Sequence, residues 1–476
     1  MRWETVIGLE THVELNTDTK IFCSCSTAFG APPNTQCCPV CMGLPGSLPV
    51  LNRRVVEYAA RIALALNCSI TPLNRFDRKN YFYPDLPKAY QISQLYLPIA
   101  REGWLDVEME QGRKSIRIHE MHMEEDAGKL IHHPDGGDTR IDYNRCGVPL
   151  VEIVTEPDFR SADEVVAYLE QLRSVLLYLG VSDGKLQEGS LRCDVNLSVR
   201  PEGSQTLGVR TEMKNLGSFR AVRRAIEYES QRQIRILESG GRVIRQTLRW
   251  DEDADQSIPM RTKEDAADYR YFPEPDLPPV ELDEAFLTDL RTQQPELAAQ
   301  KRARYCKDWG LSAYDARMLT GQRSLAEFFE RTVALGAPPK KAANWIMGQV
   351  LRQLSARNLQ AQDMTLQPKV LARLIALVEQ GRINRNTAVE VFDAVFDGGD
   401  PEEYIAAHGL ERISDCAQVR QAVEQVFAEN PRSVADWRAG KEKALGFLVG
   451  QTMRMLQGKA DPQTVNKLIR DRLTEE

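Results

Sequence analysis

No hydrophobic run in this 476-residue chain reaches the roughly 20 residues that a membrane helix needs. The first residues, 1–5, also lack the basic segment followed by an apolar one that marks a secretory signal. With 42% hydrophobic and 27% charged residues, the composition is that of an ordinary globular protein. We therefore expect a cytoplasmic protein with no membrane-spanning segment, and the length predicts roughly three domains.

An excess of positive charge is also absent, because the net charge is −7 at pH 7. This argues against a general nucleic-acid coat, whose non-specific binding rests on clustered Lys and Arg. The stretch 438–472 differs from the net negative charge of the whole chain, because it contains eight basic and three acidic residues. It is typical either of amphipathic helices with solvated charges or of a local nucleic-acid surface. If it is a nucleic-acid surface, the candidate contacts are Lys441, Lys443, Arg454, Lys459 and Lys467.

The two common fingerprints of phosphate-binding loops, G-x-x-x-x-G-K-[ST] and G-x-G-x-x-G, do not occur in the sequence. Instead, polar side chains alternate along three stretches that we predict to be β-strands. Because alternate side chains of a strand share a face, each stretch presents metal- and phosphate-seeking groups together. These groups are Glu10, His12 and Glu14 in the first stretch, Arg192, Asp194 and Asn196 in the second, and Arg210, Glu212 and Lys214 in the third.

An antiparallel sheet with one solvated face shows the same alternation without any chemistry, which is the alternative for each strand taken alone. If the three polar faces converge, carboxylates around one imidazole suit Mg²⁺ or Mn²⁺ better than a structural zinc ion. Arg192, Arg210 and Lys214 would then hold phosphate. The turn at 188–190 could add backbone amides and the Ser190 hydroxyl, although a single glycine is weak support.

Five of the ten cysteines fall within nineteen residues, in a C-x-C pair followed by Cys37 and a C-x-x-C pair. This spacing is typical of a tetrahedral thiolate zinc site, which is structural when all four positions are filled by protein. Free thiols or a redox pair are the alternatives, and a disulfide is disfavoured in a reducing cytosol. Cys37 is either not a zinc ligand or takes the place of Cys38 as one. The predicted zinc knuckle over 23–41 uses Cys23, Cys25, Cys38 and Cys41.

The distribution of alternating runs, turn residues and helical patterns along the chain predicts an α+β fold. Short alternating runs and turn residues fill the first part, until a proline-rich stretch at 273–279 that suits neither a helix nor a central strand. Helices dominate afterwards, with a further break at the Gly/Asp-rich segment 396–400. We therefore predict a domain with a mixed or antiparallel sheet over 1–292, an all-α domain over 293–402 and a small α-helical tail over 403–476.

Several longer motifs closely resemble the B subunit of aspartyl/glutamyl-tRNA amidotransferases, GatB, along essentially the whole chain. The resemblance implies a cradle-like catalytic domain, a helical domain and a tail similar to the YqeY type. The motifs are Asp77–Asp85 (DRKNYFYPD), Lys88–Gln94 (KAYQISQ), Glu124–Lys129 (EEDAGK), Glu188–Asn196 (EGSLRCDVN), Asp268–Asp276 (DYRYFPEPD), Asn344–Gly348 (NWIMG) and Gly446–Gln451 (GFLVGQ).

The resemblance implies a repair reaction on mischarged tRNA. Glu-tRNA(Gln) or Asp-tRNA(Asn) becomes Gln-tRNA(Gln) or Asn-tRNA(Asn), and this subunit uses ATP to phosphorylate the side-chain carboxylate. Ammonia channelled from a GatA-type amidase subunit then displaces the phosphate, and a small GatC-type subunit completes the heterotrimer. ATP, Mg²⁺ and a structural Zn²⁺ are the implied cofactors.

The resemblance also implies roles for individual residues. The expected magnesium ligands are His12, Glu125 and Glu10, and Asp194 and Glu212 complete the catalytic set. Glu124 competes with Glu125, because the alternation before this pair is irregular. Tyrosines packed into a core are nearly as good an explanation for Tyr81 and Tyr83 as substrate contacts. The candidates for ATP or phosphate contacts are Lys79, Lys88, Ser190, Arg192, Arg210 and Lys214, and those for the aminoacyl end are Tyr81, Tyr83 and Ser93.

Two other functions remain open at this point. A non-catalytic tRNA-docking scaffold would have no need for carboxylates and a histidine on polar strand faces. A free-standing ATP-dependent ligase acting on a small-molecule acid would explain the site but not the basic helical tail.

Overall fold

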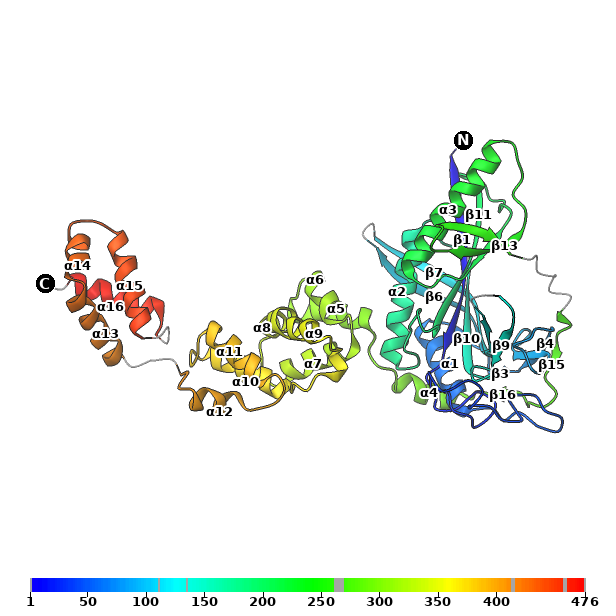
Figure 1. Ribbon diagram of the computed structural model, residues 1–476, viewed down its shortest axis with the longest axis horizontal. Helices are drawn as coiled ribbons and strands as arrows, with labels where there is room; N and C mark the ends of the chain where they lie inside the picture. The colour runs from blue at the N-terminus through cyan, green and yellow to red at the C-terminus, as the bar shows by residue number, and fades with distance from the viewer. Residues whose placement is uncertain are drawn as a thin grey trace. The chain divides into compact units, whose positions relative to one another are not determined.

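The computed structural model describes residues 2–109, 112–133, 136–260, 269–411, 416–456 and 460–474. The chain divides into two compact units, 1–298 and 299–476, which are described separately (Figure 1). The first unit ends slightly beyond the boundary predicted at 292. Helix α4 (Glu284–Thr292) belongs to it because this helix packs against α1 (Arg53–Ala65).

A nine-stranded sheet forms the body of the first unit, in the order β14-β13-β12-β11-β1-β10-β7-β6-β2. The pair β12 and β13 is parallel and the other neighbours are antiparallel, so the sheet is mixed, as predicted. Its strands are β1 (Trp3–Glu14), β2 (Ser69–Ile70), β6 (Ala100–Met109), β7 (Gly112–Glu125), β10 (Pro149–Thr155), β11 (Leu191–Pro201), β12 (Thr211–Lys214), β13 (Gln246–Asp251) and β14 (Gln256–Pro259).

The two central strands, β1 and β11, alternate in burial as the sequence predicts. On β1, Leu9 and Val13 are buried while Glu10 and His12 are partly exposed. On β11, Val195 is buried between two partly exposed polar positions. The sheet therefore has one apolar and one polar face along these strands.

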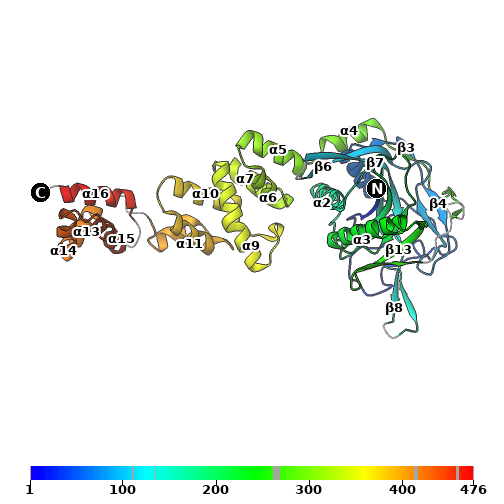
Figure 2. The ribbon, with the colours of Figure 1, turned by 90° about the horizontal axis from the view of Figure 1, so that it is seen from above.

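Three helices cover the apolar face: α1, α2 (Ala162–Leu179) and α3 (Phe219–Glu238) (Figure 1). Helices α2 and α3 pack against each other, and Figure 2 shows them side by side. The Ser161 side chain accepts a hydrogen bond from the Glu164 backbone N–H at the start of α2, and Gly180 ends the helix in the left-handed conformation at φ 71°. Leu9, Val195, Leu169 and other side chains from these layers share one hydrophobic core, which leaves only the opposite face of the sheet free for polar chemistry.

Shorter strands and loops complete the first unit around the polar side. A three-stranded sheet has the order β15-β4-β5, and two further pairs are β16-β3 and β8-β9. Their bounds are β3 (Leu73–Asn74), β4 (Asp77–Asn80), β5 (Tyr90–Ser93), β8 (Lys129–His132), β9 (Thr139–Asp142), β15 (Phe272–Pro273) and β16 (Val280–Glu281).

The described residues of the second unit are helical and contain two separate hydrophobic cores, one from Tyr305 to Ile405 and one from Val419 to Leu473. The boundary predicted at 402 is misplaced, since it falls inside α12, whose Ile405 is buried in the first of these cores. The helices are α5 (Ala298–Trp309), α6 (Ala313–Leu319), α7 (Arg323–Ala334), α8 (Pro339–Trp345), the π-helix η2 (Ile346–Val350), α9 (Leu351–Arg357), the 3₁₀ turn η3 (Ala361–Asp363), α10 (Pro368–Glu379), α11 (Arg385–Val395), α12 (Pro401–Ala407), α13 (Cys416–Glu429), α14 (Pro431–Arg438), α15 (Lys443–Met455) and α16 (Pro462–Thr474).

Among the described residues, none of the helices combines the length and the apolar character needed to cross a bilayer. The fold class is α+β with an all-helical C-terminal unit, which confirms the prediction made from the sequence.

Candidate functional site

The polar face of the large sheet brings together side chains from five adjacent strands. The cross-strand register places Glu10 opposite Asp194, and His12 opposite both Arg192 on β11 and Glu152 on β10. On the β12 side, Glu212 lies opposite Asn196. On the β7 side, His122 lies opposite Glu152. Directly opposed residues share a face, so the predicted strand faces do converge.

A first cluster on this face consists of Glu10, Asp194 and Glu212, whose carboxylate oxygens lie within 4.8 Å of one another. Lys214 forms ion pairs with Asp194 and, at 2.8 Å, with Glu212. Asn196 donates a hydrogen bond of 2.9 Å to Glu10. Burial raises the pKa of Glu10, and the nearby carboxylates Glu152, Asp194 and Glu212 act in the same direction. Three carboxylates held this close favour a bound cation.

A second cluster consists of His12, Glu124 and Glu152, again with ligand atoms within 4.8 Å of one another. His12 Nε2 lies 3.4 Å from Glu152 and 3.6 Å from Glu124. Behind them, His122 Nε2 is 3.1 Å from Glu152. Burial opposes the charge on His122, but the two glutamates outweigh it and raise its pKa to about 10. His122 is therefore a buried cation that holds both glutamates in their ionised form.

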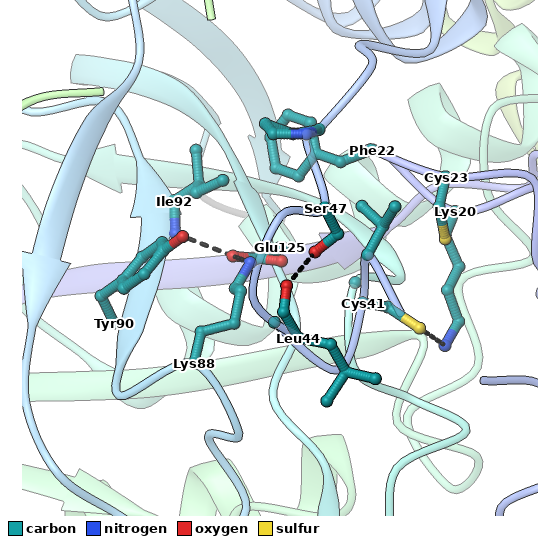
Figure 3. Close-up of a pocket in the computed structure, with 14 residues that line it drawn as sticks. Lys20, Phe22, Cys23, Cys41, Leu44, Ser47, Lys88, Tyr90, Ile92 and Glu125 are labelled. Carbon is teal, nitrogen blue, oxygen red and sulfur yellow. Dashed lines mark hydrogen bonds and ion pairs between the residues drawn. The ribbon is translucent and has the colours of Figure 1, made fainter. Parts of the chain in front are cut away.

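Glu125, which the resemblance pairs with His12, does not lie beside His12 in the structure, where Glu124 occupies that place. Adjacent residues of β7 point to opposite faces, and Glu124 takes the polar face. Glu125 instead forms an ion pair with Lys88 and accepts a hydrogen bond of 2.9 Å from the Ile92 backbone N–H. Figure 3 shows this pair in a pocket that also contains Cys41. Lys88 therefore also lies away from the two carboxylate clusters.

Several other predicted residues do reach the second cluster. Arg192 donates a hydrogen bond of 2.7 Å to Asp126. Burial lowers the pKa of Lys79, but Glu124 and Glu152 overcome this effect and raise it above the ordinary value. The Ser93 hydroxyl donates a hydrogen bond of 3.4 Å to Glu124. Lys79 and Ser93 thus place an amine and a hydroxyl near these glutamates, and Arg192 adds a guanidinium opposite His12, groups that can bind phosphate or a carboxylate.

The remaining candidates of the first unit are more dispersed. Tyr81 packs edge-on against Tyr269 at 5.8 Å between ring centroids, near Lys79, whereas the Tyr83 side chain is 57% exposed. Arg210 precedes β12 and lies at the rim of a pocket that includes Glu10. Ser190 lies at the other end of the polar face, where its carbonyl accepts a hydrogen bond of 2.9 Å from the Glu14 N–H.

The four cysteines predicted to bind zinc, Cys23, Cys25, Cys38 and Cys41, have sulfur atoms within 4.8 Å of one another. Cys37 is outside this group and contacts Asn144. A hydrogen bond from Cys23 lowers the pKa of Cys41 to about 4, with help from the buried Lys20. A stabilised thiolate is the form that binds a metal, so the donor set fits zinc.

Three of the five basic residues predicted in the tail are exposed on described helices. Lys443 and Arg454 lie on α15, and Lys467 lies on α16. Lys441 is paired with Asp436 at 2.8 Å. Lys459 lies outside the described residues.

Comparison with known protein families identifies the class of protein to which this fold and this site belong. Residues 5–288 match the model of the GatB/GatE catalytic domain, and residues 327–473 match that of the GatB domain. The chain therefore belongs to the GatB family. Relatives named as the B subunit of aspartyl/glutamyl-tRNA(Asn/Gln) amidotransferase include those of Lachnoclostridium phytofermentans (55% identical over 473 residues) and Lachnospira eligens (54% over 479), each with 99% of both chains covered. The relative of that name in Moorella thermoacetica is 54% identical over 476 residues, 99% of this chain and 100% of its own.

Sequence reasoning missed Glu152, a member of the second cluster, and His122, which lies behind that cluster. The signal for Glu152 was present, because it is the single charged residue in the otherwise apolar β10 sequence PLVEIVT. For His122 the spacing to Glu124 was visible in the sequence, but the face that this pair shares follows from the register with β10.

Proposed function

We propose that this chain is the subunit of a tRNA-dependent amidotransferase that activates the side-chain carboxylate of Glu-tRNA(Gln), Asp-tRNA(Asn) or both, using ATP. A GatA-type amidase subunit supplies ammonia and a GatC-type small subunit joins the two. The names of the relatives support the substrate class and the multi-subunit assembly. The product is the correctly amidated aminoacyl-tRNA.

The observation that carries this proposal is the row of two anionic clusters along one sheet face. A carboxylate is a poor electrophile, and phosphorylating it requires two anions to approach each other. That approach needs positive charge from metal ions and from side chains. A docking scaffold for a separate catalyst would not need a buried, ionised cluster of this kind.

Mg²⁺ bound at these clusters would neutralise phosphate charge and orient the reacting groups. Glu10, Asp194 and Glu212 would hold one ion, and His12, Glu124 and Glu152 a second. Hard oxygen ligands in each set fit this metal. Lys214 and Arg192 would bind phosphate oxygens, and both side chains already lie against acidic groups of the face.

Lys79, Ser93 and Tyr81 are proposed to position the amino-acid end of the tRNA beside the second cluster. The amine and hydroxyl donors suit a carboxylate, and Glu124 contacts Ser93 already. Lys88 and Glu125 pair with each other on the other side of β7, so the proposal assigns the second ion to Glu124 in place of Glu125.

The cysteine cluster is proposed to hold a structural zinc ion. Four thiolates close the coordination sphere, so no position remains for a substrate. Lys20 is fully buried and its Nζ lies 3.7 Å from the Cys41 sulfur, which offsets part of the negative charge of such a site.

The helical tail is proposed to hold the outer body of the tRNA through phosphate contacts from Lys443, Arg454 and Lys467. Charge reversal of Lys467 and Arg454 together should weaken tRNA affinity by about 10-fold and reduce its salt dependence. The paired Lys441 should matter less. Unchanged affinity after removal of residues 412–476 would place the tRNA elsewhere.

The decisive experiment assembles this chain with the amidase and small subunits and supplies Glu-tRNA(Gln), ATP and Mg²⁺ without an ammonia source. We expect ATP cleavage that depends on the charged tRNA and is lost in His12→Ala. Cleavage supported by free glutamate would instead favour a small-molecule ligase. Cleavage that persists in His12→Ala would move the site away from this face.

A further inference from the structure

A cavity of about 250 Å³ opens at the end of the polar face where β1 finishes at Glu14. We call it the Glu14 pocket. Glu14 forms one wall and the segment 27–31, which includes Phe29, forms another. The proposed function uses none of these residues.

The strand register ties this pocket to the second cluster. Glu14 follows His12 by two positions on β1, which is about 7 Å along the strand. It also lies in the same cross-strand row as Glu124, with Leu150 of β10 between them. A ligand that fills the pocket therefore ends within one strand step of the second cluster.

A buried donor lacks an acceptor on the path between the pocket and the cluster. Arg192 lies opposite His12 and extends to Asp126, but its Nε finds no hydrogen-bond acceptor among the described residues. Leaving such a group unpaired is costly. The ester carbonyl of an aminoacyl group on this path would supply the acceptor.

The charged lining of the pocket has two sides. Glu14 and Glu188 offer carboxylates, and the Glu14 carboxyl receives no hydrogen bond from the described residues. Lys129 and Arg145 offer cations, of which Lys129 is exposed and Arg145 is fixed by two backbone carbonyls at 3.0 and 2.8 Å. A nucleotide matches this division. Its ribose hydroxyls and an adenine amine are donors, and its phosphate is an anion.

Phe29 supplies a flat apolar surface beside the cavity. Its side chain is 80% exposed, although its loop is fixed on both sides. Gln36 donates a side-chain hydrogen bond of 3.1 Å to the Ala28 carbonyl, and Asn144 donates one of 2.7 Å to the Pro32 carbonyl. A single exposed ring needs no ligand. A ring held beside a charged cavity, however, is the arrangement on which single-stranded RNA bases stack.

We infer that the Glu14 pocket binds the 3′-terminal adenosine of the charged tRNA. The base stacks on Phe29, a ribose hydroxyl donates to Glu14, and the terminal phosphate lies at Lys129. This inference rests on the proposed function and adds the subsite that orients the RNA substrate.

The length of the aminoacyl group agrees with this placement. Five bonds separate the ribose oxygen from the side-chain carboxyl carbon of an esterified glutamate, or about 6 Å when extended. The step from Glu14 to His12 is about 7 Å. A ribose at Glu14 therefore delivers the side-chain carboxylate to the second cluster.

The test replaces the terminal adenine of the charged tRNA with 2-aminopurine, whose fluorescence falls when the base stacks on an aromatic ring. Binding to the assembled enzyme without ATP should quench the fluorescence at least 2-fold in wild type and in Phe29→Tyr. Phe29→Ala should lose most of this quenching. A non-hydrolysable ATP analogue should not restore the fluorescence, because the adenosine in the pocket comes from the tRNA.

Kinetic constants give a second readout. Phe29→Ala should raise the KM for charged tRNA about 10-fold and leave the KM for ATP within 2-fold. Lys129→Ala should act in the same direction by about 2- to 5-fold. Two matched controls should change neither constant. Ile244→Ala removes a 65% exposed side chain outside the pocket, and Arg140→Ala removes an exposed cation from the strand paired with β8.

Equal quenching by wild type and Phe29→Ala, or an equal KM for charged tRNA, would overturn the inference. Fluorescence restored by the ATP analogue would overturn it too and assign the pocket to free nucleotide. If wild type quenches the probe but cleaves no ATP with charged tRNA, the subsite stands and the proposed function fails.

Discussion

The cysteine cluster and the carboxylate face differ in how the chain assembles them. The four cysteines come from nineteen consecutive residues and need only local turns to meet. The carboxylate face draws Glu10, Glu124, Glu152, Asp194 and Glu212 from five strands. One site is a closed set of soft ligands, and the other is an open row of hard ligands beside a cavity. This difference favours a structural role for the first and a chemical role for the second.

The largest expected effect comes from the first carboxylate cluster. Glu212→Gln should reduce tRNA-dependent ATP cleavage at least 10²-fold, because it removes one of the charges that would hold the metal. The thermal midpoint should change little, since Glu212 lies on the partly exposed face. Glu202→Gln, at an exposed position after β11, is the matched control. Equal ATP cleavage by the two variants would contradict a chemical role for the first cluster.

The second prediction separates Glu152 from Glu125. Glu152→Gln should raise the Mg²⁺ concentration needed for half-maximal activity about 10-fold, because Glu152 contacts both His12 and His122. Glu125→Gln should leave this concentration within 2-fold but lower the thermal midpoint, because it leaves the ammonium of Lys88 buried without its partner. Titration of both variants with Mg²⁺ shows which of the two glutamates sets the metal requirement. A larger metal effect in Glu125→Gln would restore the assignment implied by the resemblance.

The third prediction concerns the cysteines, where stability should change. Cys25→Ser should lose stoichiometric zinc and lower the thermal midpoint by roughly 5–10 °C, as expected when a structural metal is lost. Cys37→Ser, one residue from the cluster, should retain both zinc and the wild-type midpoint. Metal analysis and calorimetry provide the two readouts. Zinc retained in Cys25→Ser would contradict the four-cysteine site.

The smallest expected effect is a dependence of stability on pH. Burial and the nearby Asp126 raise the pKa of Glu14 to about 7, from an ordinary value of 4.5. The folded state therefore binds a proton more tightly than the unfolded state. The carboxyl contributes its stability below about pH 4.5 and loses it as the pH rises to 7.

Glu14→Gln should thus be more stable than wild type at pH 8, by about 1–2 kcal/mol after allowance for partial exposure. The advantage should disappear below pH 4.5. Denaturant unfolding without divalent cations, over pH 4–8, measures it. A constant difference across that range would show that Glu14 does not titrate as described.

The same contrast explains what the sequence could predict. The cysteine group needed only spacing, and the alternation of β1 and β11 correctly indicated which side chains share a face. The α+β class followed from periodicity and from the proline-rich boundary. Each of these signals is local, within one strand or one loop.

The sequence was least informative where the pairing register between distant strands determines which side chains lie together. Glu124 and Glu125 are adjacent glutamates, and only the pairing of β7 with β10 assigns Glu124 to the side of His12. Glu152 became a cluster member through the same pairing. The boundary at 402 failed because a Gly/Asp-rich break precedes α12 without ending the hydrophobic core that Ile405 joins.

The strict alternation of β1 also limits how this protein can change in length. An insertion of one residue between Gly8 and His12 would turn Glu10 toward the helices and a leucine toward the two clusters. Both the core and the clusters would be lost at once. Insertions and deletions should therefore be tolerated in turns such as the one at Gly203, beyond β11, but excluded from β1, β10 and β11.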